Sequence, residues 1–424
     1  MQPTNMKVIL LEQQEEVLGL LRSVQSIARE KESEYLEIVA AKWIKVISGV
    51  RRCGKSFLSV SAFTEQQNWI YINFDDERLS ELTTKELNSI YEAALSIKSD
   101  IRYWIFDEIQ NIKHWDLFIN RLQRKGLNII VTGSNGKLLS KEISTHLTGR
   151  SIGLELFPFS FREFLGSNNI QVNDILTTEK TVVVKNKFDV WFKDGGFPEA
   201  IVSPFKKTYL QDLFNKIISR DILQRYNLRN PKGIKQLATI MIESVGQELS
   251  YRKLASSLKL GSMNTIKKYI DYLCDCYLFF EVEAYSDKSR ERQARPRKIY
   301  CIDNGVINAV TVSRSENKGR QLENIVFLEL RRRQISIYYL KESDFEVDFI
   351  VFEKNKIRKL IQVCWSLSDE KTRQREVQGL VKACHKYNLN TGIILTYDDE
   401  VEFIEDGITI ECIPVYKWLL SNKI

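Results

Sequence analysis

Short apolar segments alternate with amphipathic segments between residues 43 and 160. Apolar positions at helical spacing fill the stretches between four apolar runs, at 43–48, 69–74, 103–108 and 127–134. This alternation predicts a parallel sheet with helices on both faces, because each crossover between parallel strands places a helix against the sheet. Helical spacing at residues 7–37 predicts a helix or a helix pair before the first strand. The first expected domain therefore covers residues 1–160.

The later part of the chain is mainly helical from residue 160 to about 285. A helix, a turn at Gly261 and Ser262, a second helix and two strand-like runs follow one another between residues 247 and 303. That order is typical of a winged helix. Beyond residue 318, short strands again alternate with helices. We therefore expect a helical and winged-helix domain at 161–305 and a third domain, of α/β type, at 318–424.

The first apolar run ends in a glycine-containing turn that fits the phosphate-loop pattern G-x4-G-K-[ST]. In such a loop, backbone N–H groups and the N-terminus of the next helix bind phosphates. The lysine, here Lys55, reaches the β- and γ-phosphates, and the hydroxyl, here Ser56, holds Mg²⁺. A chance fit is the alternative, but the strand before the turn and the helical pattern after it favour a site for ATP and Mg²⁺. The expected nucleotide contacts are Gly49, Val50, Arg51, Arg52, Cys53, Gly54, Lys55, Ser56 and Phe57.

The third apolar run ends in two carboxylates, Asp107 and Glu108. Hydrolysis at a phosphate loop needs a carboxylate that holds the metal and a group that accepts a proton from water. We assign Asp107 to the metal, together with Ser56, and Glu108 to the role of general base. Ser134 and Asn135, at the tip of the next strand, are expected to contact the γ-phosphate or the water; a plain turn is their alternative, since Gly, Ser and Asn favour turns.

Two arginines are candidates for the finger that stabilises charge on the γ-phosphoryl group. Arg150, in LTGRS, is the preferred candidate and is expected among the catalytic residues with Lys55 and Glu108. Arg220, in ISRDI, is the weaker one, and a solvated surface arginine is the alternative for Arg150. A finger acts within its own chain or across a subunit interface, and the sequence leaves the oligomeric state open.

Several of these segments together resemble one family. They are GVRRCGKS, IFDEIQ, TGSN, LTGRSIGLELFPFSFREFL, GGFPEA and ISRDILQRY. They resemble the bacterial and archaeal AAA-type ATPases that carry an uncharacterised C-terminal domain, and the resemblance covers nearly the whole chain. It implies an AAA+-like P-loop NTPase module, then a winged helix, then a domain similar to the PD-(D/E)xK nuclease fold. It implies no particular cellular process.

The resemblance also implies a metal-dependent nuclease motif of the form E, then D, then [E/Q]-x-K. Glu323, Asp348 and Gln362 match it, but Cys364 stands in place of the lysine. A neutral thiol cannot supply a fixed positive charge. We therefore expect a binding module descended from a nuclease rather than an active one. A lysine that has taken over the role from elsewhere is left open, with three candidates, Lys354, Lys356 and Lys359.

The expected winged helix raises the question of DNA. Lys267 and Lys268 on its second helix would face phosphate, and the loop at 286–298, which includes Arg292, Arg295 and Arg297, is rich in basic residues. The run Arg331–Arg333 would face phosphate or solvent. The alternative is a winged helix that serves as a packing or partner-binding module. The net charge of +7 over 424 residues favours neither reading.

Composition excludes several classes of function. Seven scattered cysteines, an odd number, predict reduced thiols in the cytoplasm rather than a disulfide framework. With three histidines, a zinc site or a histidine-dependent nucleophile is weakly supported. No apolar run approaches the length of a membrane span, and the N-terminus lacks the pattern of a signal peptide. We therefore expect a cytoplasmic protein without membrane contact.

The main hypothesis is a Mg²⁺-dependent ATPase whose nucleotide state alters the arrangement of the winged-helix and C-terminal domains. One alternative is a nucleic-acid-binding regulator in which ATP only sets a conformation. The other is a nuclease gated by ATP. A preference for ATP over GTP does not follow from the sequence, because no base-reading motif is evident.

Overall fold

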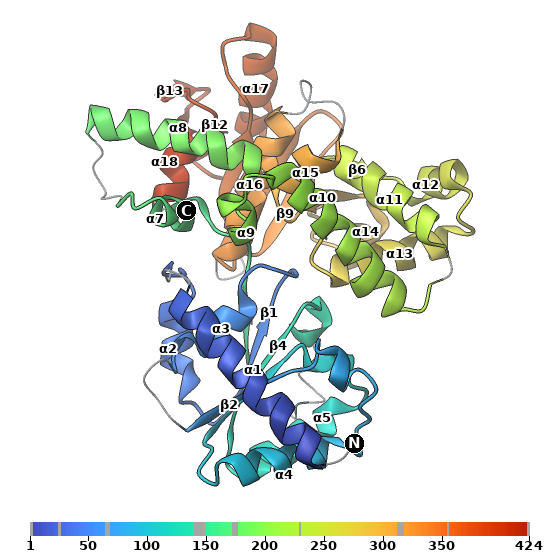
Figure 1. Ribbon diagram of the computed structural model, residues 1–424. Helices are drawn as coiled ribbons and strands as arrows, with labels where there is room; N and C mark the ends of the chain where they lie inside the picture. The colour runs from blue at the N-terminus through green and yellow to red at the C-terminus, as the bar shows by residue number, and fades with distance from the viewer. Residues whose placement is uncertain are drawn as a thin grey trace. The chain divides into compact units, whose positions relative to one another are not determined.

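The structure, a computed structural model, describes residues 3–23, 27–63, 68–139, 147, 149–171, 177–228, 230–311, 318–353 and 356–421. The chain forms two compact units (Figure 1). The N-terminal unit comprises Met1–Phe157 with Asp275–Tyr277, and the C-terminal unit comprises Pro158–Cys274 and Leu278–Ile424. The residues that the sequence assigned to a second and a third domain thus lie in one compact unit, and the boundary between those two domains stays a prediction.

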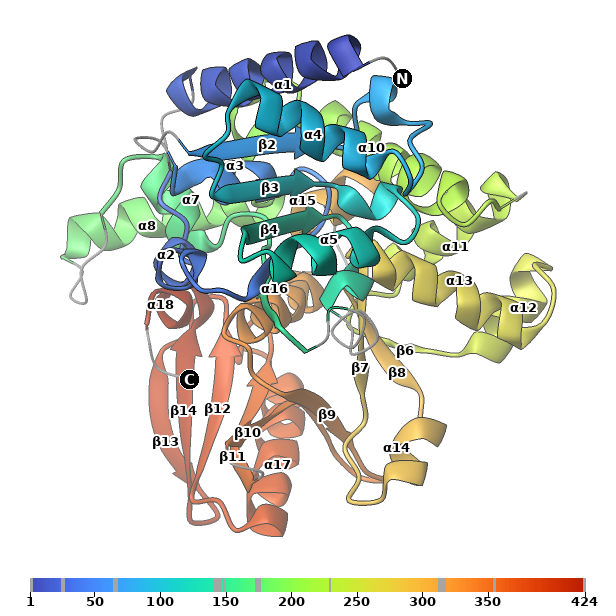
Figure 2. The same cartoon turned by 90° about the horizontal axis from the view of Figure 1, so that it is seen from below.

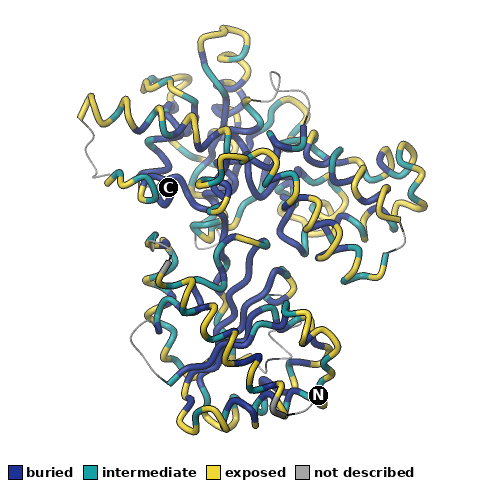
Figure 3. Tube along the Cα trace, viewed as in Figure 1, coloured by how far each residue is buried: buried dark blue, intermediate teal, exposed yellow. Residues whose placement is uncertain are grey.

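A five-stranded parallel sheet forms the centre of the N-terminal unit, with the strand order β2-β3-β4-β1-β5. Its strands are β1 (Ile44–Ser48), β2 (Trp69–Asn73), β3 (Tyr103–Asp107), β4 (Asn128–Gly133) and β5 (Ser151–Glu155). The predicted parallel sheet is therefore confirmed. β1, β3 and β4 are buried along their whole length (Figure 3). Because the strands are parallel, the loops that follow β1, β3 and β4 leave the sheet at the same edge, where such folds bind ligands.

Helices pack on both faces of this sheet. They are α1 (Pro3–Ser23), α2 (Glu32–Val39), α3 (Lys55–Ser61), α4 (Leu87–Ile97) and α5 (Trp115–Arg124), with short turns η1 (Glu77–Leu79), η2 (Ile109–Asn111) and η3 (Gly136–Leu139). Successive side chains of a strand point to opposite faces. Trp104 and Phe106 of β3 pack in one apolar core with residues of α1, α4 and α5. Tyr103 points to the other face, where its ring lies 4.9 Å from that of Phe63, just after α3.

Two sheets organise the C-terminal unit. The larger has the order β13-β14-β12-β11-β10-β9, and Figure 2 shows β13, β14 and β12 side by side. The smaller has the order β6-β8-β7. The strands are β6 (Glu248–Leu249), β7 (Phe279–Glu283), β8 (Arg297–Cys301), β9 (Ile337–Lys341), β10 (Glu346–Glu353), β11 (Lys356–Val363), β12 (Thr391–Thr396), β13 (Val401–Glu405) and β14 (Ile408–Pro414).

This unit also contains most of the helices of the described chain. They are α7 (Phe161–Ser167), α8 (Thr178–Asp194), α9 (Pro198–Val202), α10 (Lys206–Lys216), the π-helical segment η4 (Ile217–Gln224), α11 (Pro231–Glu243), α12 (Tyr251–Leu258), α13 (Met263–Asp275), α14 (Ser289–Ala294), α15 (Asn304–Val310), α16 (Lys318–Arg332), α17 (Glu370–Tyr387) and α18 (Val415–Leu420). Across the described ranges, we find no helix with the length and apolar character needed to cross a lipid bilayer.

A contact between the two sheets holds the C-terminal unit together. The backbone N–H of Tyr285, just after β7, donates to the carbonyl oxygen of Tyr339 in β9 at 2.7 Å, and Ala284 forms a parallel bridge with the same residue. The three-stranded sheet β6-β8-β7 is therefore joined to strand β9 of the six-stranded sheet by backbone contacts. The loop that the sequence predicted at 286–298 contains the short helix α14 and the start of β8.

Candidate functional site

The turn after β1 has the backbone geometry of a loop preformed around an anion. A Cβ atom on Gly49 would lie 2.1 Å from the carbonyl oxygen of Leu156, so only glycine lets the turn pass this strand end. Arg52 and Gly54 both have left-handed backbone conformations, with φ of 68° and 99°. A side chain at such a φ carries a strain cost of about 1–3 kcal/mol. Alternation of left- and right-handed residues turns successive N–H groups into one concave surface, which suits phosphate.

Lys55, the first residue of α3, extends its side chain back into this turn. Its ammonium donates to the carbonyl oxygen of Val50 at 3.1 Å and lies 3.4 Å from Oε1 of Glu108. The lysine is buried. Of the other predicted contacts, Val50 and Cys53 are buried, and the guanidinium of Arg51 pairs with Asp75 at 3.0 Å. Lys55 is thus a buried cation directed into the turn, which fits the binding of nucleotide phosphates.

Ser56 and Asp107, the two residues predicted to hold the metal, are in contact. The Ser56 hydroxyl donates to Oδ2 of Asp107 at 2.6 Å. Asp107 also accepts short hydrogen bonds from the hydroxyls of Tyr71 and Thr132. Burial raises the pKa of Asp107, and the charge of Glu108 raises it further. A buried carboxylate with oxygen donors around it is the kind of group that Mg²⁺ selects.

Glu108 lies beside Lys55 in a left-handed conformation, with φ of 52°. Its Oε2 accepts from the backbone N–H of Ser134 at 3.1 Å and from the Ser134 hydroxyl at 3.0 Å, and a short hydrogen bond joins it to the Gln110 amide. Although burial opposes ionisation, Lys55 and then Arg51 hold the pKa of Glu108 to about 2. The carboxylate is therefore charged and fixed by partners on two sides.

The structure gives the two residues predicted after β4 different surroundings. Ser134 contacts the carboxylate of Glu108, as described above, so it positions the expected base. Asn135 instead accepts from the backbone N–H of Lys137 at 2.9 Å, which caps the short turn η3. This is the turn role that the sequence had left as its alternative.

Arg29 is a site residue that sequence reasoning missed. It is buried, donates to the carbonyl oxygen of Cys53 at 2.8 Å, and donates to that of Phe157 at 2.7 Å. It thereby ties the phosphate loop to the last residue of the N-terminal unit. No local signal marks it, because the charged segment around it looks like an exposed helix. Thr132 was also missed, although a polar residue inside an apolar strand run was a usable signal.

Arg150 is not near the phosphate loop of its own chain. It directly precedes β5, where Ser151 pairs with Ile44 at the start of β1, whereas the loop begins after Ser48 at the other end. Five residues of extended strand separate these ends by about 16 Å at roughly 3.3 Å per residue. The exposed Arg150 side chain therefore does not reach a nucleotide bound in its own chain, so the first of the two settings that the sequence left open for this finger is not supported. Arg220 is exposed on η4 in the C-terminal unit.

A second cluster of charged residues lies in the C-terminal unit, where the nuclease-like motif was predicted. Glu323 of α16, Asp348 of β10 and Gln362 of β11 are all buried. Oε1 of Gln362 accepts from the backbone N–H of Asp348 at 3.2 Å. Oδ2 of Asp348 accepts from the backbone N–H of Val363 at 2.9 Å. The structure thus brings three of the four motif residues together. Cys364 belongs to an apolar core that also contains Leu367 and Cys412.

A lysine from another element enters this cluster. The ammonium of Lys298, on β8, lies 2.9 Å from Oδ1 of Asp348, 3.2 Å from Oε1 of Glu323 and 2.8 Å from Oε1 of Glu346. Burial lowers the pKa of Lys298, but Asp348 and Glu323 outweigh burial, and the net pKa is well above that of a free lysine. The sequence analysis counted Lys298 as the last residue of the basic loop at 286–298. The structure buries Lys298 among the residues of the predicted nuclease-like motif.

Two of the three lysines considered as replacements, Lys356 and Lys359, are described, and neither of them reaches this cluster. Lys356 is exposed at the start of β11, six residues before Gln362. Lys359 is three residues before Gln362, and an odd spacing along a strand places side chains on opposite faces. Lys354 lies outside the described residues.

The basic residues considered for nucleic acid divide into two groups. Those with partners inside the C-terminal unit include Arg297, which pairs with Glu281 at 3.0 Å, and Arg295, which donates to the carbonyl oxygen of Lys341 at 3.1 Å. Arg292 donates to the carbonyl oxygen of Ser286, and Arg332 and Arg333 both contact Glu329. The exposed residues are Lys267, Lys268, Lys288, Arg290 and Arg331, and Lys288 pairs with Glu291 at 3.1 Å.

Two features define a P-loop nucleotide-binding protein. One is a glycine-containing loop between a buried parallel strand and a helix. The other is a carboxylate at the end of a strand in the same sheet. A family model described as an AAA domain matches residues 41–165. Two models described as domains of unknown function match residues 186–317 (DUF8612) and 318–418 (DUF4143). Residues 41–165 are therefore an AAA-type P-loop domain.

Full-length relatives show the family. The chain is 39% identical over 397 residues to the uncharacterized protein MJ1544 of Methanocaldococcus jannaschii, covering 89% of this chain and 88% of that protein. It is 30% identical over 394 residues to an uncharacterized protein of Haemophilus influenzae, covering 89% and 94%. The chain belongs to the family that these archaeal and bacterial proteins share.

Among solved structures, a STAND protein with a tetratricopeptide repeat sensor from Pyrococcus horikoshii matches 73% of this chain and 46% of that chain at 15% identity, with a TM-score of 0.28.

Proposed function

We propose that the protein binds ATP with Mg²⁺ at the loop Gly49–Ser56 and hydrolyses it. The observation that carries this proposal is the convergence of Lys55, Ser56, Asp107 and Glu108, with the Ser56 hydroxyl 2.6 Å from Asp107 and the Lys55 ammonium 3.4 Å from Glu108. These residues come from α3 and the end of β3, which the parallel sheet holds at one edge.

Each of these residues has one expected role. Lys55 binds the β- and γ-phosphates, and the Ser56 hydroxyl and the Asp107 carboxylate hold the metal. A bound Mg²⁺ would neutralise negative charge on the phosphates. Glu108 accepts the proton of the attacking water, and Ser134 holds the carboxylate of Glu108 in place for that transfer.

The ion pair between Lys55 and Glu108 supports a coupling between binding and catalysis. Lys55 is the largest of the influences that lower the pKa of Glu108, to about 2, and a base of that strength takes a proton poorly. When Lys55 turns to phosphate it leaves Glu108, whose pKa then rises. Glu108 becomes an effective base only in the nucleotide-bound protein.

We further propose that the nucleotide state acts as a switch on the C-terminal unit. Arg29 joins the carbonyl oxygens of Cys53, in the phosphate loop, and Phe157, the last residue before the C-terminal unit. The carbonyl of Leu156 lies against Gly49. A shift of the loop on binding phosphate therefore acts directly on the chain segment that connects the two units.

For the C-terminal unit we propose a nuclease-like domain without cleavage activity. Lys298 occupies the space among Glu323, Glu346 and Asp348, where a metal-dependent nuclease would bind its cation. Lys298 and its two partners in the predicted motif, Glu323 and Asp348, are buried, which keeps a nucleic acid backbone away from them. The domain then serves as a binding or structural module.

Nucleic acid binding is a second candidate function, favoured by one observation. The order α11, β6, α12, α13, β7, β8 is that of a winged helix, with α13 in the place of the recognition helix. Lys267 and Lys268 are exposed on α13, and Lys288 and Arg290 are exposed between β7 and β8. Because Arg297 and Lys298 are engaged inside the unit, these four residues carry the proposal.

The experiment that tests the main proposal is a phosphate-release assay with the full chain. We expect Mg²⁺-dependent ATP hydrolysis in the wild type and its loss in Lys55→Ala. Lys113→Ala changes an exposed lysine of the same unit and is the matched control, with wild-type turnover expected. Hydrolysis by Lys55→Ala at the wild-type rate would show that another site is responsible.

A further inference from the structure

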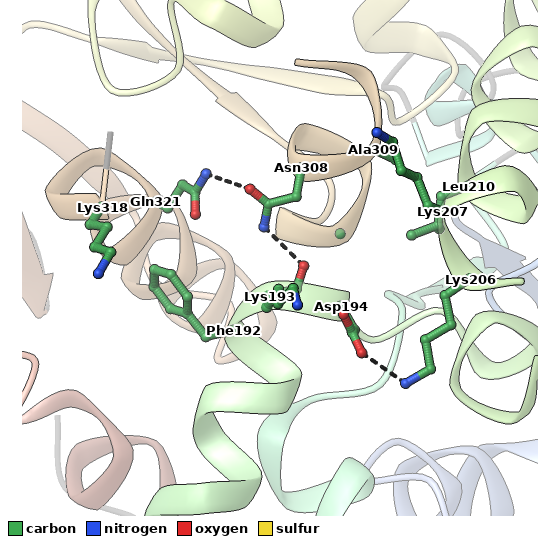
Figure 4. Close-up of a pocket in the computed structure, with 11 residues that line it drawn as sticks. Phe192, Lys193, Asp194, Lys206, Lys207, Leu210, Asn308, Ala309, Lys318 and Gln321 are labelled. Carbon is green, nitrogen blue, oxygen red and sulfur yellow. Dashed lines mark hydrogen bonds and ion pairs between the residues drawn. The ribbon is translucent and has the colours of Figure 1, made fainter. Parts of the chain in front are cut away.

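A pocket of about 280 Å³ lies in the C-terminal unit, and its lining includes no residue of the charged cluster around Lys298. Helices α8, α10, α15 and α16 line it, and Figure 4 shows their side chains around it. Phe192, Leu210 and Ala309 are buried and give the pocket an apolar surface.

Four lysines and one carboxylate also line the pocket. The ammonium of Lys206 donates to Asp194 at 2.7 Å, so this pair is neutral as a whole. The other three are Lys193, Lys207 and Lys318, and all three are exposed at the pocket. Lys318 lies 4.9 Å from the centre of the Trp365 ring, which holds it in place without neutralising its charge. The described pocket therefore carries three positive charges without a carboxylate to balance them.

The positions of these lysines on their helices are unfavourable for helix stability. Lys206 and Lys207 are the first two residues of α10, and Lys318 is the first residue of α16. The N-terminus of a helix is its positive end, where acidic residues are stabilising and basic ones are not. Neither helix has an acidic residue in its first turn, and no side chain caps the start of α10. An anion in the pocket would compensate both the lysines and the helix ends.

The polar groups at the pocket floor are held in fixed positions. The Gln321 amide donates to Oδ1 of Asn308 at 2.8 Å, and the Asn308 amide donates to the carbonyl oxygen of Lys193 at 2.9 Å, as the dashed lines of Figure 4 show. This chain of hydrogen bonds joins α16, α15 and α8. The pocket is thus preformed rather than a gap between mobile side chains.

We propose that this pocket binds a small organic anion. The apolar part of the ligand packs on Phe192, Leu210 and Ala309, and its phosphate or carboxylate group is bound by Lys193 and Lys207, while Lys318 adds positive charge at the other side of the pocket. The proposal is independent of the ATP site, because all lining residues belong to the C-terminal unit.

The test is isothermal titration calorimetry of the full chain with 1-naphthyl phosphate and with 1-naphthoate. Inorganic phosphate, which lacks the apolar part, and 1-naphthol, which lacks the charge, are the comparison ligands. We expect one saturable site for at least one of the two naphthyl anions and at least tenfold weaker binding of both comparison ligands. Which anion binds more tightly identifies the phosphate or the carboxylate as the preferred group.

Variants locate the site. Lys193→Met and Lys207→Met should each weaken binding about tenfold, the effect of losing one charge-assisted contact. Lys180→Met, an exposed lysine on the same helix as Lys193, is the control and should bind as the wild type does. Binding should persist in Lys55→Ala, which separates this pocket from the phosphate loop. The absence of saturable binding, its loss in Lys55→Ala, or equal affinities in the pocket variants would each overturn the proposal.

Discussion

Replacement of Lys298 by methionine tests whether this residue is the internal cation of the buried cluster that contains Glu323 and Asp348. The change keeps most of the side-chain volume and removes the charge that lies within 3.2 Å of three carboxylates. Glu323 and Asp348 are buried, and loss of one partner from a buried ion pair costs about 3–5 kcal/mol. Glu346 is 39% exposed and adds less than about 1 kcal/mol. We therefore expect Lys298→Met to lower the free energy of unfolding of the C-terminal unit by about 3–5 kcal/mol at pH 8.

The same variant should show a characteristic pH dependence. Burial and the charge of Asp348 raise the pKa of Glu323 to about 7, against the influence of Lys298. A carboxyl group whose pKa is higher in the folded state than in the unfolded state stabilises the fold at pH values below the pKa of the unfolded state. This stabilisation is lost as the pH rises through the pKa of the folded state. Without Lys298 the pKa of Glu323 rises further. At pH 5.5, where Glu323 is protonated, the cost of the substitution should be smaller by about 1–2 kcal/mol, since one pKa unit corresponds to about 1.4 kcal/mol.

Urea unfolding followed by circular dichroism at pH 8 and pH 5.5 measures both effects. Lys341→Met removes a lysine that is 45% exposed and paired with Glu248, so it is the matched control and should cost less than about 1 kcal/mol. Adding Glu323→Gln and Asp348→Asn to Lys298→Met should recover most of the loss, because the buried charges are then gone. A loss as small as that of the control, or one of equal size at both pH values, would refute this account of Lys298.

Three further predictions concern the other proposals. Arg29→Met should lower kcat/KM for ATP about tenfold or more, because two buried carbonyl oxygens lose a charged donor. Arg22→Met, on the exposed face of α1, is the control and should leave kcat/KM unchanged. Equal kcat/KM values for the two variants would show that Arg29 does not position the loop. If the winged helix binds duplex DNA, changing Lys267 and Lys268 to alanine should lower the slope of log K against log salt by about 2, and no mobility shift of DNA at low salt would remove this function. Incubation with DNA, Mn²⁺ and ATP should yield no cleavage, and cleavage that disappears in Asp348→Ala would contradict the assignment of Lys298 as a substitute cation.

The sequence was most informative where the chemistry is contiguous. Gly49 to Ser56 form one loop, and Asp107 follows an apolar run, so a local pattern was enough to predict both. The parallel sheet then explains why they meet, since β1 and β3 end at the same edge. Ser134 was found for the same reason, although its partner is the carboxylate of Glu108 rather than phosphate.

Other parts of the site could not be read from local patterns. Arg150 belongs to a family-like segment, but the segment does not say at which end of β5 the arginine lies. Lys298 stands in a basic stretch of sequence, and only the position of β8 against α16 and β10 turns it into a buried cation. Arg29 is remote in sequence from both carbonyl oxygens that it binds. Such contacts depend on how distant elements pack, which hydrophobic periodicity does not specify.

The central claim, that Lys55 and Glu108 serve one ATPase site, is tested most directly by comparing binding and turnover in two variants. The measurement is ATP affinity and steady-state hydrolysis for the wild type, Lys55→Ala and Glu108→Gln under the same Mg²⁺ concentration. Our account predicts that Glu108→Gln retains ATP binding but loses turnover by at least about 100-fold, the lower range for removal of a general base. Lys55→Ala should lose both binding and turnover. Turnover by Glu108→Gln at the wild-type rate would contradict the account.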